Sequence, residues 1–367
     1  MHRQPLRPSA LTSPALGRQS RRRYAVLLPS SALPPNLPPV PEAPGSSFGP
    51  STTPPPRPSQ SVHRGLDDYI FGRFQRLRSS SSFVPLRNLL REYRENRERV
   101  LDDYLPYEPA PPGDRRVDLS RNEDDGGTVL IAHVIAEPVG QEKVVVCSGF
   151  PVRTRYGQAN DEGGRTLIVT CTHTIEQVQF LCPTDAGGTT LIFTSSGRPI
   201  PATSVPSSLP GRDLTLLAIP QQAESYFRPL PVSPYPLPES AEVGVHNSVE
   251  EDMLLLRGGI QGWERWIDGK VRRRWGMGQV EGYKDQAWRD AQPGTYDHLA
   301  HLLFLPLPTG SSSGGPIVSK ETGAVVGVVV GDRIDGVKRG QKGWGVPAEA
   351  IFEMFSLPGL TLKNKNK

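Results

Sequence analysis

Residues 310–318 read GSSSGGPIV, three serines followed by two glycines, a proline and the start of an apolar segment. A loop rich in serine and glycine is most often only flexible. A serine hydroxyl becomes a strong nucleophile only when a histidine accepts its proton and a carboxylate holds that histidine. One of these serines is therefore a candidate nucleophile only if the rest of the chain supplies both a histidine and a carboxylate.

Two apolar runs earlier in the chain supply these groups. Residues 167–175 read LIVTCTHTI and place His173 at the end of a run, and residues 211–219 read GRDLTLLAI and place Asp213 before another. Each alone is weak evidence, because a histidine at a strand end is usually structural and an aspartate before an apolar run often caps a turn. The chain order of His173, Asp213 and Ser313 is one that Ser-His-Asp enzymes use, and it favours a joint role.

The 367 residues divide into two parts of different composition. Residues 1–63 hold 15 of the 39 prolines and show almost no apolar periodicity, so we expect a disordered leader. This leader has seven arginines and one acidic residue, Glu42, and therefore carries +6, whereas the whole chain carries +4. The rest of the chain is slightly acidic by difference, so its charge gives no indication of nucleic-acid binding.

The leader has the composition of a mitochondrial transit peptide. Its arginines are interspersed with serine, alanine and leucine, and the stretch RRYA at residues 22–25 resembles a matrix processing site that would leave Ala25 at the mature N-terminus. Three early prolines would interrupt a presequence helix, and a merely basic, disordered tail is the alternative. No apolar run resembles a secretory signal or a membrane span. We expect a mitochondrial location, with the matrix and the intermembrane space both open.

Cysteine usage agrees with an intracellular protein. Cys147, Cys171 and Cys182 are an odd number without framework spacing, so no disulfide pattern is predicted. No Cys-x-x-Cys motif occurs, and DHLAH at residues 297–301 lacks a carboxylate between its histidines and the spacing of a zinc helix. We expect neither a metal nor another cofactor.

Two helices are predicted in a helical extension over residues 64–108. Residues 65–77 and 85–105 show apolar residues at helical spacing, with Pro85 at the start of the second helix and Pro106 just past its end. A surface brace packed on the following domain is the favoured role. A partner-binding or membrane-surface helix is the alternative.

From residue 126 the pattern changes to short runs rich in valine, isoleucine and leucine, separated by glycine, proline and polar turns. Many short strands without intervening helices are typical of a sandwich or a pair of barrels and not of a βαβ fold. The predicted strands are residues 128–136, 143–152, 165–171, 190–193, 214–219, 253–256, 301–305, 316–318 and 324–330, and residues 347–355 are predicted to be helical.

Together these motifs resemble the trypsin-like serine peptidases, and within them the HtrA type. LIVTCTHTI resembles the family's strand ending in T-A-A-H, RDLTLLAI its D-x-A-L-L segment, and SSSGGPIV its G-x-S-G-G-P. CSGFPV before the histidine resembles the GSGF strand, AVVGVVVG the strand after the nucleophile, and GWGVPAEAI the HtrA segment GFAIP before the last helix. The resemblance covers roughly residues 126–356.

The resemblance implies a mainly β fold of two perpendicular, six-stranded antiparallel barrels, residues 126–231 and 232–356, with the site in the cleft between them. Ser313 would attack a peptide carbonyl, His173 would take and return the proton, and Asp213 would hold the imidazole. The implied activity is a serine endopeptidase that acts on protein or peptide substrates in mitochondrial processing or quality control. A catalytically silent trypsin-fold protein, acting as a binding or structural module, is the alternative.

The serine loop departs from the family two residues before Ser313. That position is normally a glycine, whose N–H joins that of the nucleophile in the oxyanion hole, and here it is Ser311. A Cβ atom disfavours positive φ, and loss of one oxyanion donor costs about 10²–10³ in rate. In the other register Ser312 is the nucleophile, which restores Gly310 two residues before it but loses the glycine that should follow.

The sequence gives weaker signals for substrate specificity and for regulation. Leu307, six residues before Ser313, stands where trypsins keep an aspartate, so an apolar or small P1 residue is predicted. The basic tail, residues 357–367, would leave no room for the PDZ domain of HtrA proteins. Regulation would then use the N-terminal helices, residues 235–300, or assembly into a homo-oligomer or with a mitochondrial partner protein.

Residues 263–288 combine tryptophans with basic side chains, which could bind a nucleic acid strand. IDGK at residues 267–270 is a hairpin-turn signature, so a β-hairpin that packs on the second barrel is favoured and nucleic acid is not an expected partner. The tryptophans of this predicted hairpin are Trp263, Trp266, Trp275 and Trp288, and its water-facing basic residues are Lys270, Arg272, Arg273 and Arg274.

Overall fold

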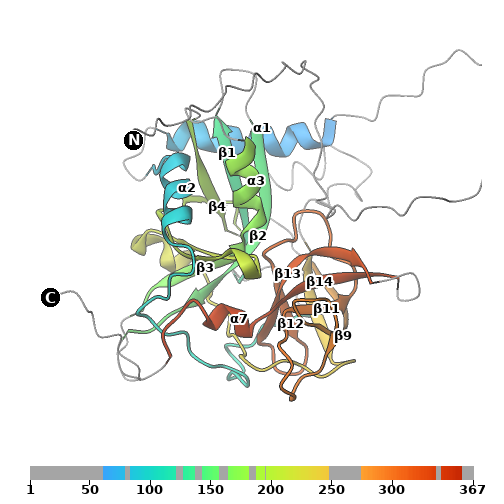
Figure 1. Ribbon diagram of the computed structural model, residues 1–367. Coiled ribbons are helices and arrows are strands. Elements are labelled where there is room, and N and C mark those ends of the chain that lie inside the picture. The colour runs from blue at the N-terminus through green and yellow to red at the C-terminus, as the bar shows by residue number, and fades with distance from the viewer. Residues whose placement is uncertain are drawn as a thin grey trace, which may run out of the picture. The chain divides into compact units, whose positions relative to one another are not determined.

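The computed structural model describes residues 61–78, 83–120, 127–136, 143–156, 164–181, 187–194, 196–247, 274–335 and 340–357 (Figure 1). Strands dominate these ranges, which confirms the mainly β class. The predicted leader up to residue 60, the basic tail from residue 358 and the strand predicted at 253–256 lie outside them. Among the described helices, none combines the length and the apolar character that crossing a membrane requires.

The first sheet is antiparallel, in the strand order β5-β4-β1-β2-β3-β7-β6. Its strands are β1 (Val129–Ala136), β2 (Lys143–Arg153), β3 (Thr166–Cys171), β4 (Gly187–Phe193), β5 (Pro199–Pro201), β6 (Ser204–Leu209) and β7 (Leu214–Ala218). The N–H groups of Ala202 and Thr203, between β5 and β6, donate to carbonyls of β4 and β7. One segment, residues 199–209, thus touches both ends of the sheet and curls it. No strand was predicted in this segment, and its two strands give the first sheet seven strands where the prediction had six. Three prolines without an N–H to donate interrupt its pairing, so the strands are short and carry no strand-like apolar run.

The second sheet closes into the predicted six-stranded barrel. Its strands are β8 (Glu242–Asn247), β9 (Arg274–Lys284), β10 (Asp290–Ala291), β11 (His301–Leu305), β12 (Pro316–Ser319), β13 (Val325–Ile334) and β14 (Gln341–Pro347). They follow the order β10-β9-β11-β14-β13-β12-β8, and β8 also pairs with β9. The ring is therefore complete, with β10 attached to β9 outside it.

An apolar core holds the two sheets together. Phe150 and Val169 of the first sheet belong to one buried cluster with Val328 and Val346 of the second. The short helix α7 (Glu349–Phe352) adds Ile351 to the same cluster. Burial of apolar surface from both sheets in one core fixes β2 and β3 next to the loop that carries Ser313.

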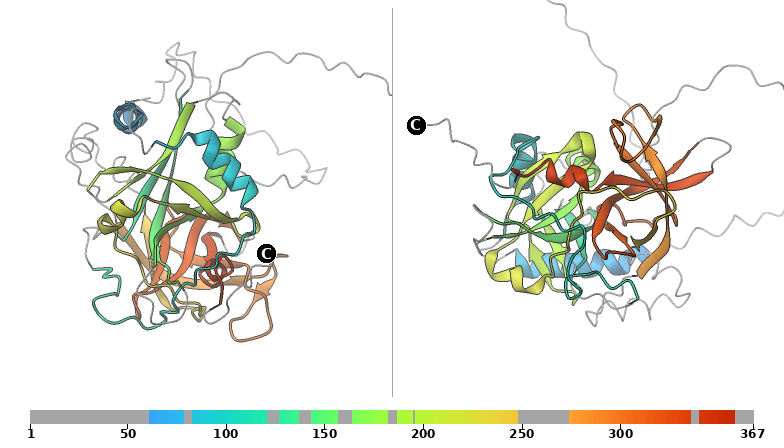
Figure 2. Two further views of the ribbon diagram at one scale, coloured as in Figure 1. Left: turned by 90° about the vertical axis from the view of Figure 1, so that its left-hand side faces the viewer. Right: turned by 90° about the horizontal axis from the view of Figure 1, so that it is seen from below.

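The predicted pair of helices precedes the first sheet. Helix α1 (Ser61–Leu77) buries Ile70 and Phe74 against β1 and β4. Strand β1 is therefore buried on both faces, which explains its continuous apolar run. Helix α2 (Leu86–Glu95) packs on the core of the first sheet, and Figure 2 shows it beside α3 (His173–Leu181). The brace interpretation of this extension therefore agrees with the packing.

The second helix is shorter than the predicted range 85–105. It ends at Glu95, and the chain continues as an extended strap. In this strap the N–H of Glu98 donates to the carbonyl of Ser208 in β6. The N–H of Leu101 donates to the carbonyl of Met354, just after α7, and the N–H of Tyr104 to that of Arg155, just after β2. The prediction was wrong here because Leu101 and Tyr104 have helical spacing, yet each is buried separately against the barrels.

Strands β8 and β9 form a hairpin whose connection, including IDGK, lies outside the described residues. Trp275 packs against the core between the sheets, and the ring of Trp288 stacks on His301 with 4.4 Å between centroids. Two of the four tryptophans thus pack on the second barrel as predicted. Trp263 and Trp266 lie outside the described residues.

Candidate active site

Pairing of β3 with β7 brings His173 and Asp213 together. Cys171 lies opposite Leu214 in this antiparallel register, so the residues that follow β3 meet the residue that precedes β7. Asp213 ends the short turn η1 (Pro210–Arg212) with a φ of 54°, a left-handed conformation that aspartate tolerates. Two predicted site residues, 40 positions apart in the chain, therefore share one edge of the sheet.

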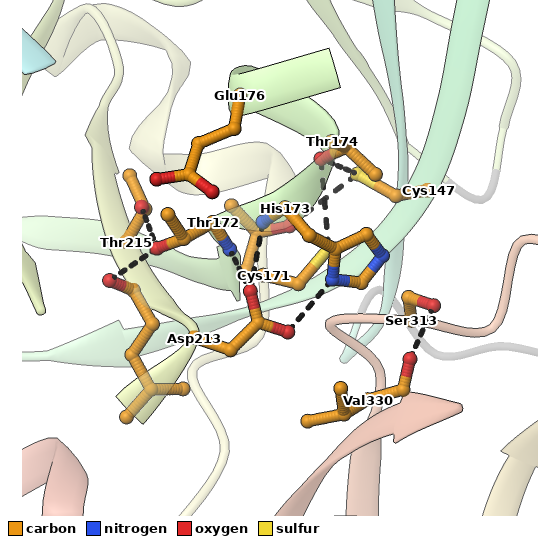
Figure 3. A network of polar contacts seen from close by, with 12 residues as sticks. Cys147, Cys171, Thr172, His173, Thr174, Glu176, Asp213, Thr215, Ser313 and Val330 are labelled. Carbon is orange, nitrogen blue, oxygen red and sulfur yellow. Dashed lines mark hydrogen bonds and ion pairs between the residues drawn. The ribbon is translucent and has the colours of Figure 1, made fainter. Parts of the chain in front are cut away.

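The Asp213 carboxylate binds the imidazole and the backbone at once (Figure 3). Its Oδ2 lies 2.7 Å from Nδ1 of His173, and its Oδ1 accepts the backbone N–H groups of Thr172 at 3.0 Å and His173 at 2.7 Å. An ionised carboxylate can only accept, so Nδ1 carries the proton and Nε2 is left as a proton acceptor. The geometry thus selects the tautomer that a general base requires.

The pKa of His173 is raised above its usual value of 6.5. Burial lowers this pKa, but the hydrogen bond and the negative charge of Asp213 raise it by more, and Glu176 adds to the increase. The nearby Cys147 thiol is fully buried, and burial raises its own pKa well above the usual value, so it is uncharged at neutral pH. Asp213 and Glu176 are therefore the charges that act on the imidazole.

Ser313 lies on the loop between β11 and β12, beyond the His173 ring from Asp213 (Figure 3). Its carbonyl accepts the N–H of Ser148 in β2 at 2.8 Å, a bond between the two barrels. Its hydroxyl donates to the carbonyl of Val330 in β13 at 2.8 Å. The hydroxyl must therefore change its donor direction before it can transfer a proton to His173, which a rotation about χ1 provides.

The two positions after Ser313 are glycines because the backbone there lies too close to neighbouring residues to leave room for a Cβ atom. Gly314 has a φ of 84°, and a Cβ atom there would lie 2.3 Å from the carbonyl oxygen of Ser148. A Cβ atom at Gly315 would lie 2.8 Å from Nδ1 of His246. Both glycines are thus required for close packing of the serine loop, Gly314 on the first barrel and Gly315 on the second.

The structure separates the two candidate nucleophiles. Ser312 is fully buried, and its hydroxyl lies 2.6 Å from Oγ1 of Thr309. Ser313 is partly exposed and faces the first barrel. Exposure and position both favour Ser313, whose catalytic role remains a prediction.

Ser311 adopts the left-handed backbone in spite of its Cβ atom. Its φ is 61°, a conformation that costs a non-glycine residue about 1–2 kcal/mol. Its carbonyl accepts the Ser148 hydroxyl at 2.8 Å, and the N–H of the same peptide, from Ser312, donates to Thr309 at 3.3 Å. Contacts at both ends of this peptide hold the loop shape. The oxyanion role of the Ser311 and Ser313 N–H groups stays a prediction.

Ser148 is a site residue that the sequence analysis did not single out. It binds the serine loop through its N–H and its hydroxyl, and its carbonyl accepts Oγ1 of Thr170 at 2.8 Å. It lies in the stretch CSGF, so the signal was present as a motif without a role. Its hydrogen bonds connect the serine loop of the second barrel to strand β2 of the first.

A histidine and carboxylate on one barrel, facing a serine loop on a second barrel in that chain order, define the trypsin class of serine peptidases. Residues 147–328 match the model of the trypsin-like peptidase domain, so the chain carries such a domain, as its motifs predicted. No curated protein matches this chain.

Two solved structures illustrate the similarity. The chain is 16% identical to the apo protease domain of MamO from Magnetospirillum magneticum, over 62% of this chain and 94% of that one, with a TM-score of 0.37. It is 14% identical to Deg5 over 62% of this chain and 87% of that one, with a TM-score of 0.39.

Proposed function

We propose that this chain is a serine endopeptidase that hydrolyses protein or peptide substrates through Ser313, His173 and Asp213. The observation that carries the proposal is the 2.7 Å contact between Oδ2 of Asp213 and Nδ1 of His173, on a ring that faces the Ser313 loop. The family's peptidase domain supports the same reaction class. The likeness of the motifs to the HtrA type adds protein processing or quality control as the cellular task.

The mechanism follows from the positions of these groups. After the Ser313 hydroxyl turns from Val330, Nε2 of His173 takes its proton while Oγ attacks the substrate carbonyl. The imidazolium that forms is stabilised by the Asp213 carboxylate, and it returns the proton to the leaving amine. The N–H groups of Ser311 and Ser313 stabilise the oxyanion. Water then hydrolyses the acyl-enzyme by the same route.

A non-catalytic binding module is the second candidate. The observation that favours it is the 2.8 Å hydrogen bond from the Ser313 hydroxyl to the Val330 carbonyl, which directs the hydroxyl away from His173. The replacement of the usual oxyanion-loop glycine by Ser311 also favours the non-catalytic module. Both candidates keep the fold, and they differ in whether Ser313 reacts.

Labelling by a fluorophosphonate distinguishes the two candidates. We expect the folded chain from Ala25 to be modified at one residue, Ser313, because only an activated serine displaces fluoride at an appreciable rate. Mass spectrometry of the digested protein identifies the modified residue, and the heat-denatured chain is the control. A folded sample that takes up no label contradicts the endopeptidase and favours the binding module.

We also propose that residues 1–63 direct the chain to mitochondria. The support is compositional: the segment has seven arginines and one acidic residue among serine, alanine and leucine. A fluorescent protein fused to residues 1–63 should be imported into mitochondria. Cleavage there should leave Ala25 as the new N-terminus of the fusion. The matched control replaces Arg21, Arg22 and Arg23 by glutamate and should stay in the cytosol. A cytosolic location of the unaltered fusion contradicts this proposal.

A further inference from the structure

Helix α2 lies outside the residues that match the peptidase domain, yet it packs into the first barrel. Three leucines and a tyrosine, at the i, i+3, i+4 and i+7 positions of one face, are its buried residues. They share a core with Ile175 and Val178 of α3, the helix that begins at His173. The helix is therefore part of the hydrophobic core that supports the histidine.

A polar contact connects α2 directly to the first turn of α3. Tyr93 is fully buried, and its hydroxyl donates to Oε1 of Glu176 at 2.7 Å, three residues after His173. The guanidinium of Arg97 lies over the Tyr93 ring at 5.0 Å and 3.7 Å from the same carboxylate oxygen. Burial and the bond to the charged Glu176 raise the pKa of Tyr93, so its hydroxyl stays protonated as a donor.

The last turn of α2 also contacts β6, the strand that leads into Asp213 through η1. Glu92 accepts the backbone N–H of Val205 at 2.8 Å, and the side-chain amide of Asn96 donates to the carbonyl of the same residue at 2.8 Å. The carbonyl of Asn96 accepts the N–H of Ser208 at 3.2 Å. Strand β6 pairs with β7 and passes through the η1 turn directly into Asp213.

We propose that α2 positions the His173–Asp213 pair, with Tyr93 as a positioning residue that acts through Glu176. The inference rests on the proposed peptidase function and extends it to a segment outside the matched domain. His173 and Asp213 belong to separate segments, and α2 is one rigid element bonded to both. A small error in their relative position lowers the rate strongly, whereas substrate binding at the second barrel is spared.

Glu176 also affects His173 through its charge. The charged or titratable groups that act on His173 are Asp213 at the start of β7, Cys147 of β2 and Glu176 of its own helix. Tyr93 and Arg97 face Glu176 from the extension. Replacing Glu176 by glutamine removes a negative charge that raises the pKa of His173, but keeps an acceptor for Tyr93. The acid limb of kcat/KM should then move to lower pH.

The test compares Tyr93→Phe and Glu176→Gln in the full chain, on a peptide substrate that the unaltered chain cleaves. Tyr93→Phe should lower kcat about 10-fold with KM unchanged, because the ring still packs while its bond to α3 is lost. Glu176→Gln should move the acid limb to lower pH. The controls are Tyr69→Phe, which removes a similar hydroxyl bond from α1 to Gly197, and Glu108→Gln, which breaks the pair with Arg115; both should behave as the unaltered chain.

Three outcomes overturn the inference. In the first, the chain is active, and the Tyr93→Phe and Glu176→Gln variants keep its kcat and pH profile. This result contradicts the role of α2 and is compatible with the peptidase function. A fall in kcat that Tyr69→Phe reproduces would make the effect general destabilisation. A folded chain with no activity and no fluorophosphonate label would remove the peptidase function and this inference together. If Tyr93→Phe does not fold, Glu176→Ala removes the acceptor of the same hydrogen bond at an exposed residue and should lower kcat in the same way; an unchanged kcat then contradicts the role of α2.

Discussion

Ser313→Ala should lower peptide hydrolysis by a factor on the order of 10⁶, close to the rate that binding and the oxyanion donors sustain alone. The hydroxyl is the atom that attacks the carbonyl, and no neighbouring serine can replace it from the same position. Ser312 is fully buried and its hydroxyl is in contact with Thr309, so it is not accessible to a substrate. The measurement is kcat/KM on a peptide substrate, together with fluorophosphonate uptake.

Ser312→Ala is the matched control for this prediction. It should keep the label and most of the activity, and cost about 1 kcal/mol of the free energy of unfolding because one buried hydrogen bond is lost. Thermal unfolding of both variants shows whether each is folded when it is assayed. Label retained by Ser313→Ala and lost by Ser312→Ala would mean that Ser312 is the nucleophile.

The pair of His173 and Asp213 was predictable because its signal is local. Each residue ends or begins a strand-like run, and antiparallel strands that pair place such ends together. Ser313 was predictable because Gly-Gly-Pro follows it, and the contacts of Gly314 with Ser148 supply the physical reason for that sequence. In each case the residue and its structural requirement lie within a few positions of one another.

Other parts of the site depend on contacts between distant residues. Ser148 meets Ser311 over 163 positions, and Tyr93 meets Glu176 over 83. Neither the periodicity nor the composition of these segments indicates such partners. The same limitation explains the helix end at Glu95, since Leu101 and Tyr104, which continue the helical spacing, pair instead with residues just after α7 and just after β2.

Ser311 is a case in which the local rule and the structure differ. A serine in place of glycine predicts resistance to positive φ. The observed φ of 61° shows that the left-handed region is reached, and the 2.8 Å bond from the Ser148 hydroxyl offsets part of its cost. The substitution therefore leaves this backbone conformation accessible.

Asp213→Asn should lower kcat by about 10⁴-fold with the fold retained. Its Oδ1 position accepts two backbone N–H groups, from Thr172 and His173, so the asparagine oxygen must take that place. The asparagine NH₂ then faces Nδ1 of His173, which has to become an acceptor and moves the ring proton to Nε2. Nε2 can no longer take a proton from Ser313.

The pH dependence separates this tautomer effect from simple loss of charge. In the unaltered chain the rate rises as His173 loses its proton, with the acid limb above pH 6.5 because Asp213 outweighs the effect of burial on this pKa. In Asp213→Asn the limb should move to lower pH, because burial then acts without that carboxylate, while the plateau stays low. Asp114→Asn, an exposed carboxylate before β1, is the control and should change neither quantity. A variant whose limb moves but whose plateau returns to the unaltered rate would show that Asp213 acts through charge alone, and that the tautomer is held by another group.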